Sequence, residues 1–206
     1  MLFRSNRKNV SIQEVPEHVK DAFISIEDSR FREHSGVDFK GIMRAVYKDI
    51  IAMKKVEGAS TITQQLAKNI FLSNEKTWMR KTKEVMAALY LERNFSKEKI
   101  LELYLNRIYF GEGTYGIEAA SQHYFQKSAS ELTVAQGALL AGLPKAPNTY
   151  SPFDNPDDAK QRRNVVLSRM YDTGKIDAAV MKQMQGSTLA VERAEDTDQT
   201  WSNSYV

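Results

Sequence analysis

The stretch EDSRFREHSG, residues 27–36, places acids, arginines and a histidine on an otherwise apolar helical pattern. Three further polar blocks follow it in order: GASTITQQLAKN at 58–69, RKTKE at 80–84 and KILELYLNRIYFG at 99–111. A purely structural helix would carry leucine or alanine at many of these positions. Because two acids, Glu27 and Glu84, fall among arginines and lysines, the blocks indicate proton transfer beside a bound phosphate.

Composition is that of a globular protein with a local basic cluster. The chain has 206 residues, 42% hydrophobic and 27% charged, which suits one well-buried domain. Net charge is only +3, but residues 68–83 hold five basic residues against one acid, which favours an anionic ligand. The absence of cysteine excludes disulfides and thiolate metal sites.

Helical periodicity dominates, so we expect a mainly α fold. The expected helices cover 16–32, 38–55, a segment starting at Thr61, 76–94, 97–109, 116–126, 130–142 and 155–174, with a short one after that. Residues 1–185 would form one domain. The polar residues 186–206 would form a linker or a frayed end.

Residues 38–55 form an amphipathic pattern with lysines and arginines opposite an apolar stripe. This pattern is typical of a helix lying in a membrane interface, and equally of a surface helix packed on its own core. The apolar candidates for membrane contact are Phe39, Ile42, Met43, Val46 and Ile50. No apolar run approaches the roughly 20 residues that span a bilayer, and the first residues lack a signal-peptide core. The protein is then either soluble and cytoplasmic, or anchored by a segment outside this stretch.

Glu27 is the best candidate for acid–base chemistry. On a continuous helix it would stand between Phe23 and Phe31, where partial desolvation raises a carboxyl pKa. The alternative is an acid at the rim of the apolar face that reaches into water. Asp28 would form a structural helix ion pair with Arg32, four residues later.

The block at 58–69 predicts a helix start with Thr61 and Gln64 as a capping box. Such a helix end presents N–H groups suited to phosphate or sugar hydroxyls. Capping does not explain Gln65 or Lys68, which could therefore bind a ligand together with Ser60.

In RKTKE, Glu84 could simply neutralise Arg80 and Lys81 on a charged surface helix. Alternatively, Arg80 and Lys83 are phosphate ligands, and Glu84 positions one of them, a metal or a reacting hydroxyl. In the fourth block we assign Glu102 and Asn106 to scaffolding, because that helix should be buried. The histidines lack the spacing of metal ligands.

Taken together, the blocks resemble those of the peptidoglycan glycosyltransferases, the lysozyme-like domain of class A penicillin-binding proteins and their monofunctional relatives. The resemblance runs from about residue 9 to 174. The motif EDxxFxxHxG is matched at 27–36, GxSTxTQQ at 58–65, RKxxE at 80–84 and the fourth motif at 99–106, with a similar fifth at RRNVVL, 162–167.

The resemblance implies a two-lobed helical domain with a small membrane-associated lobe, on the extracytoplasmic face of a bacterial membrane. Its partners would be lipid II, the growing glycan strand and moenomycin-type inhibitors. The reaction would be polymerisation of lipid II with inversion at the glycosidic centre. It also implies that the anchor helix lies outside this stretch and that the tail leads to a transpeptidase domain.

By the same resemblance, Glu27 is the catalytic base and Glu84 the second essential acid. Lys68, Arg80 and Lys83 correspond to pyrophosphate ligands, with Lys76 at a position that is arginine in some relatives. Other substrate-binding candidates are Asp28, Phe31, His34, Ser60, Thr61, Gln64, Gln65 and Lys81. No cofactor is required by the sequence, although a divalent cation, Mg²⁺ or Mn²⁺, near Glu27 or Glu84 is left open.

Two other readings compete with this one. A lysozyme-like enzyme that cleaves glycan would also use a lone glutamate, but a neutral glycan gives no role to RKTKE or Lys68. A basic helical module that binds nucleic acid would explain residues 76–83 but not Glu27 or TITQQ, so we expect no nucleic-acid partner.

Overall fold

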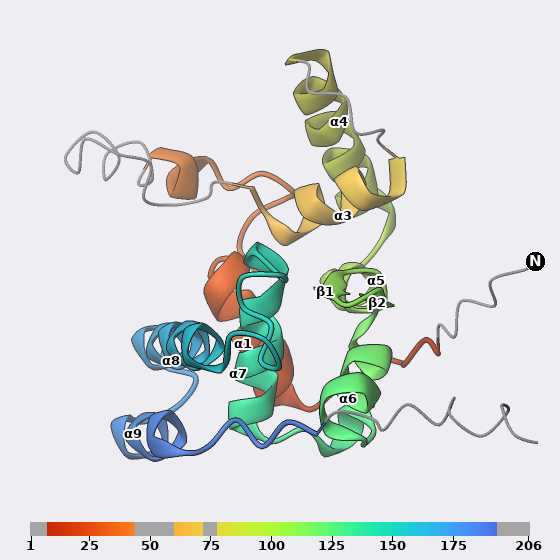
Figure 1. The fold of residues 1–206 in the computed structure, drawn as a ribbon. Coiled ribbons are helices and arrows are strands. Elements are labelled where there is room, and N and C mark those ends of the chain that lie inside the picture. The colour runs from red at the N-terminus through yellow and green to blue at the C-terminus, as the bar shows by residue number, and fades with distance from the viewer. Residues whose placement is uncertain (1–7, 44–59, 72–77, 193–206) are drawn as a thin grey trace, which may run out of the picture.

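The computed structural model describes residues 8–43, 60–71 and 78–192, and this part of the protein is mainly helical, as predicted. Residues 39–43 are helical, and one antiparallel pair of strands, β1 and β2, interrupts the described helices (Figure 1). The labelled elements are α1 (Glu17–Glu27), α3 (Ile62–Phe71), α4 (Trp78–Asn94), α5 (Lys97–Leu105), β1 (Tyr109–Gly111), β2 (Thr114–Tyr115), α6 (Ile117–Phe125), η1 (Ala129–Glu131), α7 (Val134–Gly142), η2 (Leu143–Lys145), α8 (Pro156–Asp172) and α9 (Ala178–Gly186).

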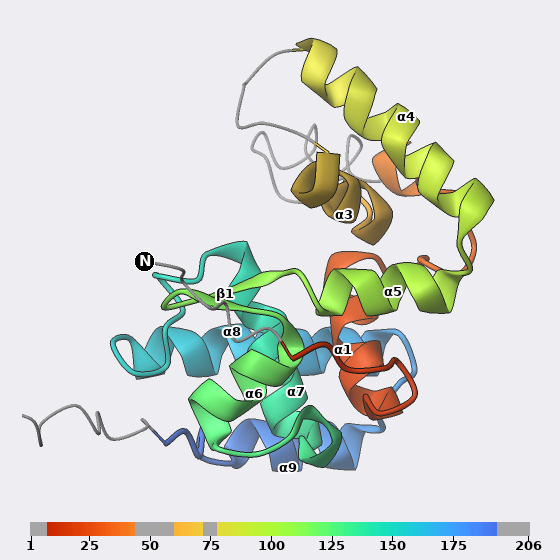
Figure 2. The ribbon, with the colours of Figure 1, turned by 90° about the vertical axis from the view of Figure 1, so that its right-hand side faces the viewer.

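The helices form two lobes. Figure 2 shows α3 and α4 standing apart from the group made by α1 and α6 to α9, with α5 between the two groups. α3 packs against α4 on one side and α5 on the other, so α5 joins the small lobe to the large one. The predicted two-lobed helical architecture is therefore confirmed.

α7 lies at the centre of the large lobe, where it packs against α1 and α8. Thr133 and Gln136 cap its start in a reciprocal box, and its residues from Gly137 onward are buried. A Cβ on Gly137 would lie 3.0 Å from a methyl carbon of Val19, so glycine lets α1 approach closely. Buried leucines such as Leu140 stabilise this contact by roughly 1.5–3 kcal/mol each.

The first helix is shorter than predicted. α1 ends at Glu27, whereas the sequence pattern extended it to about residue 32. Asp28 leaves helical geometry (φ −161°, ψ 72°), and its carboxylate binds groups outside the helix, described below. The predicted Asp28–Arg32 ion pair is also wrong, since Arg32 pairs with Glu98 at 2.6 Å.

The fourth block was predicted as one helix to residue 109, but α5 ends at Leu105 and a hairpin follows. Its turn uses positive φ at Glu112 (48°) and Gly113 (71°), a conformation that glycine adopts without strain. The scaffolding role of the two polar side chains is confirmed. Asn106 exchanges two 2.9 Å hydrogen bonds with the backbone of Val10, and Glu102 accepts one from the Ile12 N–H at 3.0 Å.

Residues 187–192 do not behave as the start of a frayed tail. The buried Arg163 side chain donates hydrogen bonds to the carbonyls of Gln185, Ser187 and Thr188 at 3.0–3.1 Å. The Glu192 N–H donates to a carbonyl of α6. This segment is therefore held against the large lobe, because a guanidinium can satisfy several carbonyls at once.

Candidate active site

A cavity of about 830 Å³ opens between the lobes, with walls from the end of α1, from α3 and α4, and from η2 and α8. Most of the predicted site residues line it, although they come from three separate blocks of the sequence. Those present are Glu27, Asp28, Ser60, Thr61, Gln64, Gln65, Lys68, Arg80, Lys81 and Glu84.

Glu27, the last residue of α1, is half-buried in the cavity wall. Gln65 of α3 donates from Nε2 to Glu27 Oε2 at 2.8 Å. Burial raises the pKa of the Glu27 carboxyl, while the Gln65 hydrogen bond and the charges of Arg162 and Lys145 oppose that rise. The expected direction of the shift is confirmed. Its expected cause, partial desolvation, is confirmed too, but the predicted setting on a continuous helix between Phe23 and Phe31 is wrong, because α1 ends at Glu27.

Three cations that line this cavity were not predicted as site residues: Arg162, Lys145 and Arg169. Arg162 lies on α8, donates from Nε to the Gly142 carbonyl at 3.2 Å and stands 5.7 Å from the Tyr150 ring centre. Its only sequence signal was the fifth motif. Lys145 gave no signal, because its place depends on how η2 turns after α7.

The buried carboxylate of Glu84 organises two cations on α4. It accepts from Arg80 Nη1 at 3.1 Å and from Lys81 Nζ, and Lys81 also donates to Ser60 Oγ at 3.1 Å. Glu84 is only 3% exposed, so this is not the solvated surface cluster of the alternative reading. One acid therefore holds an ammonium and a guanidinium at the cavity wall.

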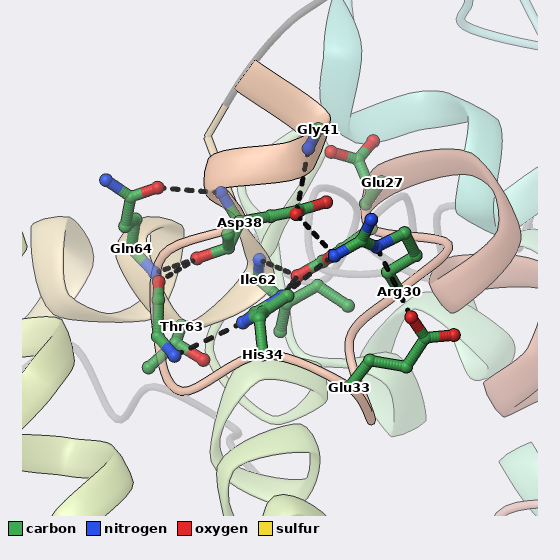
Figure 3. A network of polar contacts seen from close by, with 12 residues as sticks. Glu27, Arg30, Glu33, His34, Asp38, Gly41, Ile62, Thr63 and Gln64 are labelled. Carbon is green, nitrogen blue, oxygen red and sulfur yellow. Dashed lines mark hydrogen bonds and ion pairs between the residues drawn. The ribbon is translucent and has the colours of Figure 1, made fainter. Parts of the chain in front are cut away.

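Figure 3 shows how the loop after α1 is tied to the start of α3. Asp28 accepts hydrogen bonds from His34 Nε2 at 2.9 Å and from the Ile62 N–H at 3.1 Å. The Gly36 N–H donates to His34 Nδ1 at 3.2 Å, so the imidazole proton sits on Nε2. Thr61 Oγ1 donates to the Gly36 carbonyl at 2.7 Å. This network fixes the end of α1 beside α3.

The predicted capping box is confirmed, with a consequence for ligand binding. The Thr61 N–H donates to Gln64 Oε1 at 3.0 Å, and the Gln64 N–H donates to Thr61 Oγ1 at 3.1 Å. Because Asp28 takes the Ile62 N–H, three donors at this helix start are already used. This arrangement does not favour the expected phosphate cradle at the N-terminus of α3.

Some predicted substrate-binding residues do not line the cavity. Phe31 is fully buried in the core, and His34 is 8% exposed with both ring nitrogens hydrogen-bonded. Lys83 is exposed on α4 outside the cavity, because one residue is about 100° of helix turn and Glu84 faces the cavity. Lys76 lies outside the described residues.

Of the predicted membrane-contact residues, Phe39 and Met43 are 74% and 73% exposed, whereas Ile42 lines the cavity. Val46 and Ile50 lie outside the described residues. Asp38 ties this helix to the cavity rim. Its Oδ1 accepts from the Gly41 N–H and from Arg30 Nη2, both at 2.9 Å (Figure 3). No helix in the described ranges has the length and apolar character needed to cross a bilayer.

Glu27 and Glu84, the two acids considered for a divalent cation, are poor ligands for one. Both oxygens of Glu84 accept from cationic side chains, and Glu27 faces Arg162 and Lys145. Within the described residues no cluster of three histidines or acids has metal-binding geometry. The surroundings of Glu27 and Glu84 therefore do not suit the Mg²⁺ or Mn²⁺ ion considered from the sequence.

The family model described as "Transglycosylase" matches residues 2–171, and the chain belongs to this family. Its relatives include penicillin-binding protein 1F of Bacillus subtilis, 54% identical over all of this chain and 29% of that protein. Penicillin-binding protein 1A of Escherichia coli is 53% identical over 81% of this chain and 20% of that protein.

A crystal structure of penicillin-binding protein 1A from Haemophilus influenzae has a similar fold. It superposes with a TM-score of 0.55 and 28% identity over 92% of this chain and 18% of that one. The chain thus spans less than a third of the length of these relatives.

Proposed function

We propose that this domain is a peptidoglycan glycosyltransferase that polymerises lipid II into β-1,4-linked glycan strands and releases undecaprenyl pyrophosphate. The observation that carries this proposal is one cavity lined by a carboxylate of raised pKa, Glu27, and by the cations Lys68, Arg80 and Lys81. Membership of the transglycosylase family supports it.

In the proposed reaction, Glu27 is the general base. It takes the proton from the 4-hydroxyl of the GlcNAc unit of the incoming lipid II, and that oxygen attacks the anomeric carbon of the growing strand. The bond from this carbon to the pyrophosphate oxygen breaks, and the centre inverts from α to β. A base with a raised pKa suits this step, because it holds the proton better than an exposed glutamate.

The departing pyrophosphate needs positive charge. Lys68, Arg80 and Lys81 supply it in the proposal, and Glu84 orients the last two through its pair of hydrogen bonds. These cations favour transfer from a pyrophosphate donor over hydrolysis of a neutral glycan. The same groups would bind moenomycin-type phosphoglycolipid inhibitors.

The proposal also places the domain at a membrane and next to a second domain. The exposed Phe39 and Met43 would touch the extracytoplasmic face of a bacterial membrane, which keeps the lipid tail of the substrate beside the cavity. The polar residues at 193–206 would lead to a transpeptidase domain.

The test is consumption of purified lipid II, with gel separation of the glycan products. Wild-type protein should produce long strands, and Glu27→Gln should produce none while still binding the donor. Undiminished synthesis by Glu27→Gln would remove Glu27 from its role as base. Shortening of added glycan would point instead to a cleaving enzyme.

A further inference from the structure

We infer that Tyr104 and Gln65 act together as positioning residues that set the orientation of the Glu27 carboxylate. This inference rests on the proposed role of Glu27 as base. The three side chains form a chain of hydrogen bonds from α5 through α3 to the end of α1. Tyr104 Oη donates to Gln65 Oε1 at 3.4 Å, and Gln65 Nε2 donates to Glu27 Oε2 at 2.8 Å.

The direction of this chain follows from the chemistry of its two ends. An ionised carboxylate only accepts hydrogen bonds, so the amide of Gln65 must face Glu27 with its NH₂ group. Burial and the nearby Glu27 and Asp28 carboxylates raise the pKa of Tyr104, so the phenol keeps its proton and remains a donor. Its natural partner is the carbonyl oxygen of the same amide.

Tyr104 therefore favours one of two amide orientations that differ little in shape. Without the phenol hydroxyl, Gln65 could rotate and present its carbonyl oxygen to the Glu27 carboxylate, which is repulsive. Tyr104 is itself held rigidly, since it is 1% exposed and packs edge-on against Phe23 at 6.4 Å between ring centres. A fixed core residue thus determines which face of Gln65 meets the base.

Gln65 then has a different role from the predicted one. The sequence placed it among the substrate-binding residues, but both ends of its amide are engaged within the protein. In the described residues it is the one hydrogen-bond donor to the Glu27 carboxylate, and it binds a single oxygen. That leaves Oε1 for the substrate hydroxyl, so one oxygen orients the group and the other takes the proton.

The charged surroundings of Glu27 determine what the loss of this chain should do. Arg162 of α8 and Lys145 of η2 lower the pKa of Glu27, as the Gln65 hydrogen bond does, while burial and Asp28 raise it. Removing only the Gln65 contribution should raise the pKa further. The same change should leave Lys68, Arg80 and Lys81, the proposed ligands of the leaving group, in place.

The experiment compares Tyr104→Phe with Tyr124→Phe. Tyr124 is an equally buried tyrosine whose hydroxyl donates to the Phe110 carbonyl, and it does not line the cavity. Both variants lose one buried hydroxyl. In the lipid II assay, Tyr104→Phe should lower kcat on the order of tenfold with KM little changed, and should move the acid limb of the pH profile upward. Gln65→Leu should do the same, and the double variant should be no worse than either single one.

A second readout does not depend on activity. Carbon-13 NMR of labelled glutamate follows the titration of Glu27, whose signal is assigned from its absence in Glu27→Gln. Its midpoint should rise in Tyr104→Phe and stay unchanged in Tyr124→Phe. If both variants lose the same thermal stability but neither the midpoint nor the acid limb moves in Tyr104→Phe, the inference is wrong. If the midpoint moves while Glu27→Gln still makes glycan, Glu27 is not the base. If it moves while wild-type protein makes no glycan from lipid II, the proposed function fails. In both cases the positioning chain stands.

Discussion

Glu84 accepts a hydrogen bond from Arg80 at 3.1 Å across one turn of α4, although the carboxylate is almost completely buried. A buried acid that holds two cations is costly unless each charge is satisfied, and here Lys81 provides the second contact. Two roles for Glu84 are compatible with these contacts. The carboxylate either positions the two cations for an anionic ligand or only neutralises their charge.

Glu84→Gln should separate these roles. Glutamine can accept through one oxygen only, so Arg80 and Lys81 should lose their fixed orientation. We expect affinity for a pyrophosphate-bearing lipid to fall about tenfold, as for one lost charge-assisted hydrogen bond, measured by calorimetry. Tighter binding would instead indicate that the carboxylate only competes with the ligand for the cations.

Lys68→Ala and Arg80→Ala should each weaken binding of moenomycin about tenfold or more, because each removes a positive charge from the cavity wall. Lys83→Ala is the matched control, since Lys83 is on the same helix as Arg80 but outside the cavity. Fluorescence titration with a labelled inhibitor measures all three. Equal losses in the control and in the two cavity variants would show a diffuse charge effect and no defined pocket.

The raised pKa of Glu27 predicts opposite effects of pH on activity and stability. A base must be deprotonated, so activity should fall as pH decreases through a pKa above that of an ordinary glutamate. The native state binds this proton more tightly than the unfolded state. The resulting stabilisation is therefore present at low pH and is lost as pH rises through the folded-state pKa.

Glu27→Gln should accordingly be more stable than wild type at pH 7, with a difference that shrinks under acid conditions. Thermal unfolding of both proteins across pH 4 to 8, about the range of a perturbed carboxyl, measures this. A wild-type protein that is the more stable of the two at pH 7 would contradict the burial argument.

Phe39→Ser combined with Met43→Ser should reduce sedimentation with liposomes several-fold, because the substitutions remove exposed apolar surface from the helix at 39–43. Tyr171→Ser is the control, since Tyr171 is 45% exposed on α8 of the large lobe. If the double variant sediments with liposomes as well as wild type does, Phe39 and Met43 do not contact the membrane.

The sequence by itself determined the helical class, the capping box at Thr61 and Gln64, and the inward scaffolding of Asn106 and Glu102. These features depend on periodicity and on contacts within a few residues, or on the rule that a buried polar group finds a partner. The ordered blocks also determined the family, because their residue types and spacing are read directly from the chain.

Only the tertiary structure decided where α1 ends and which residues share the cavity. Helix propensity would have continued through Phe31, but Asp28 binds His34 and the Ile62 N–H, and these contacts outweigh one more helical turn. The charge of Arg162 acts on Glu27 because α8 packs against α1, and no local sequence pattern predicts that packing. Pairings between residues this far apart in sequence depend on how whole helices pack, so they become visible only in the folded chain.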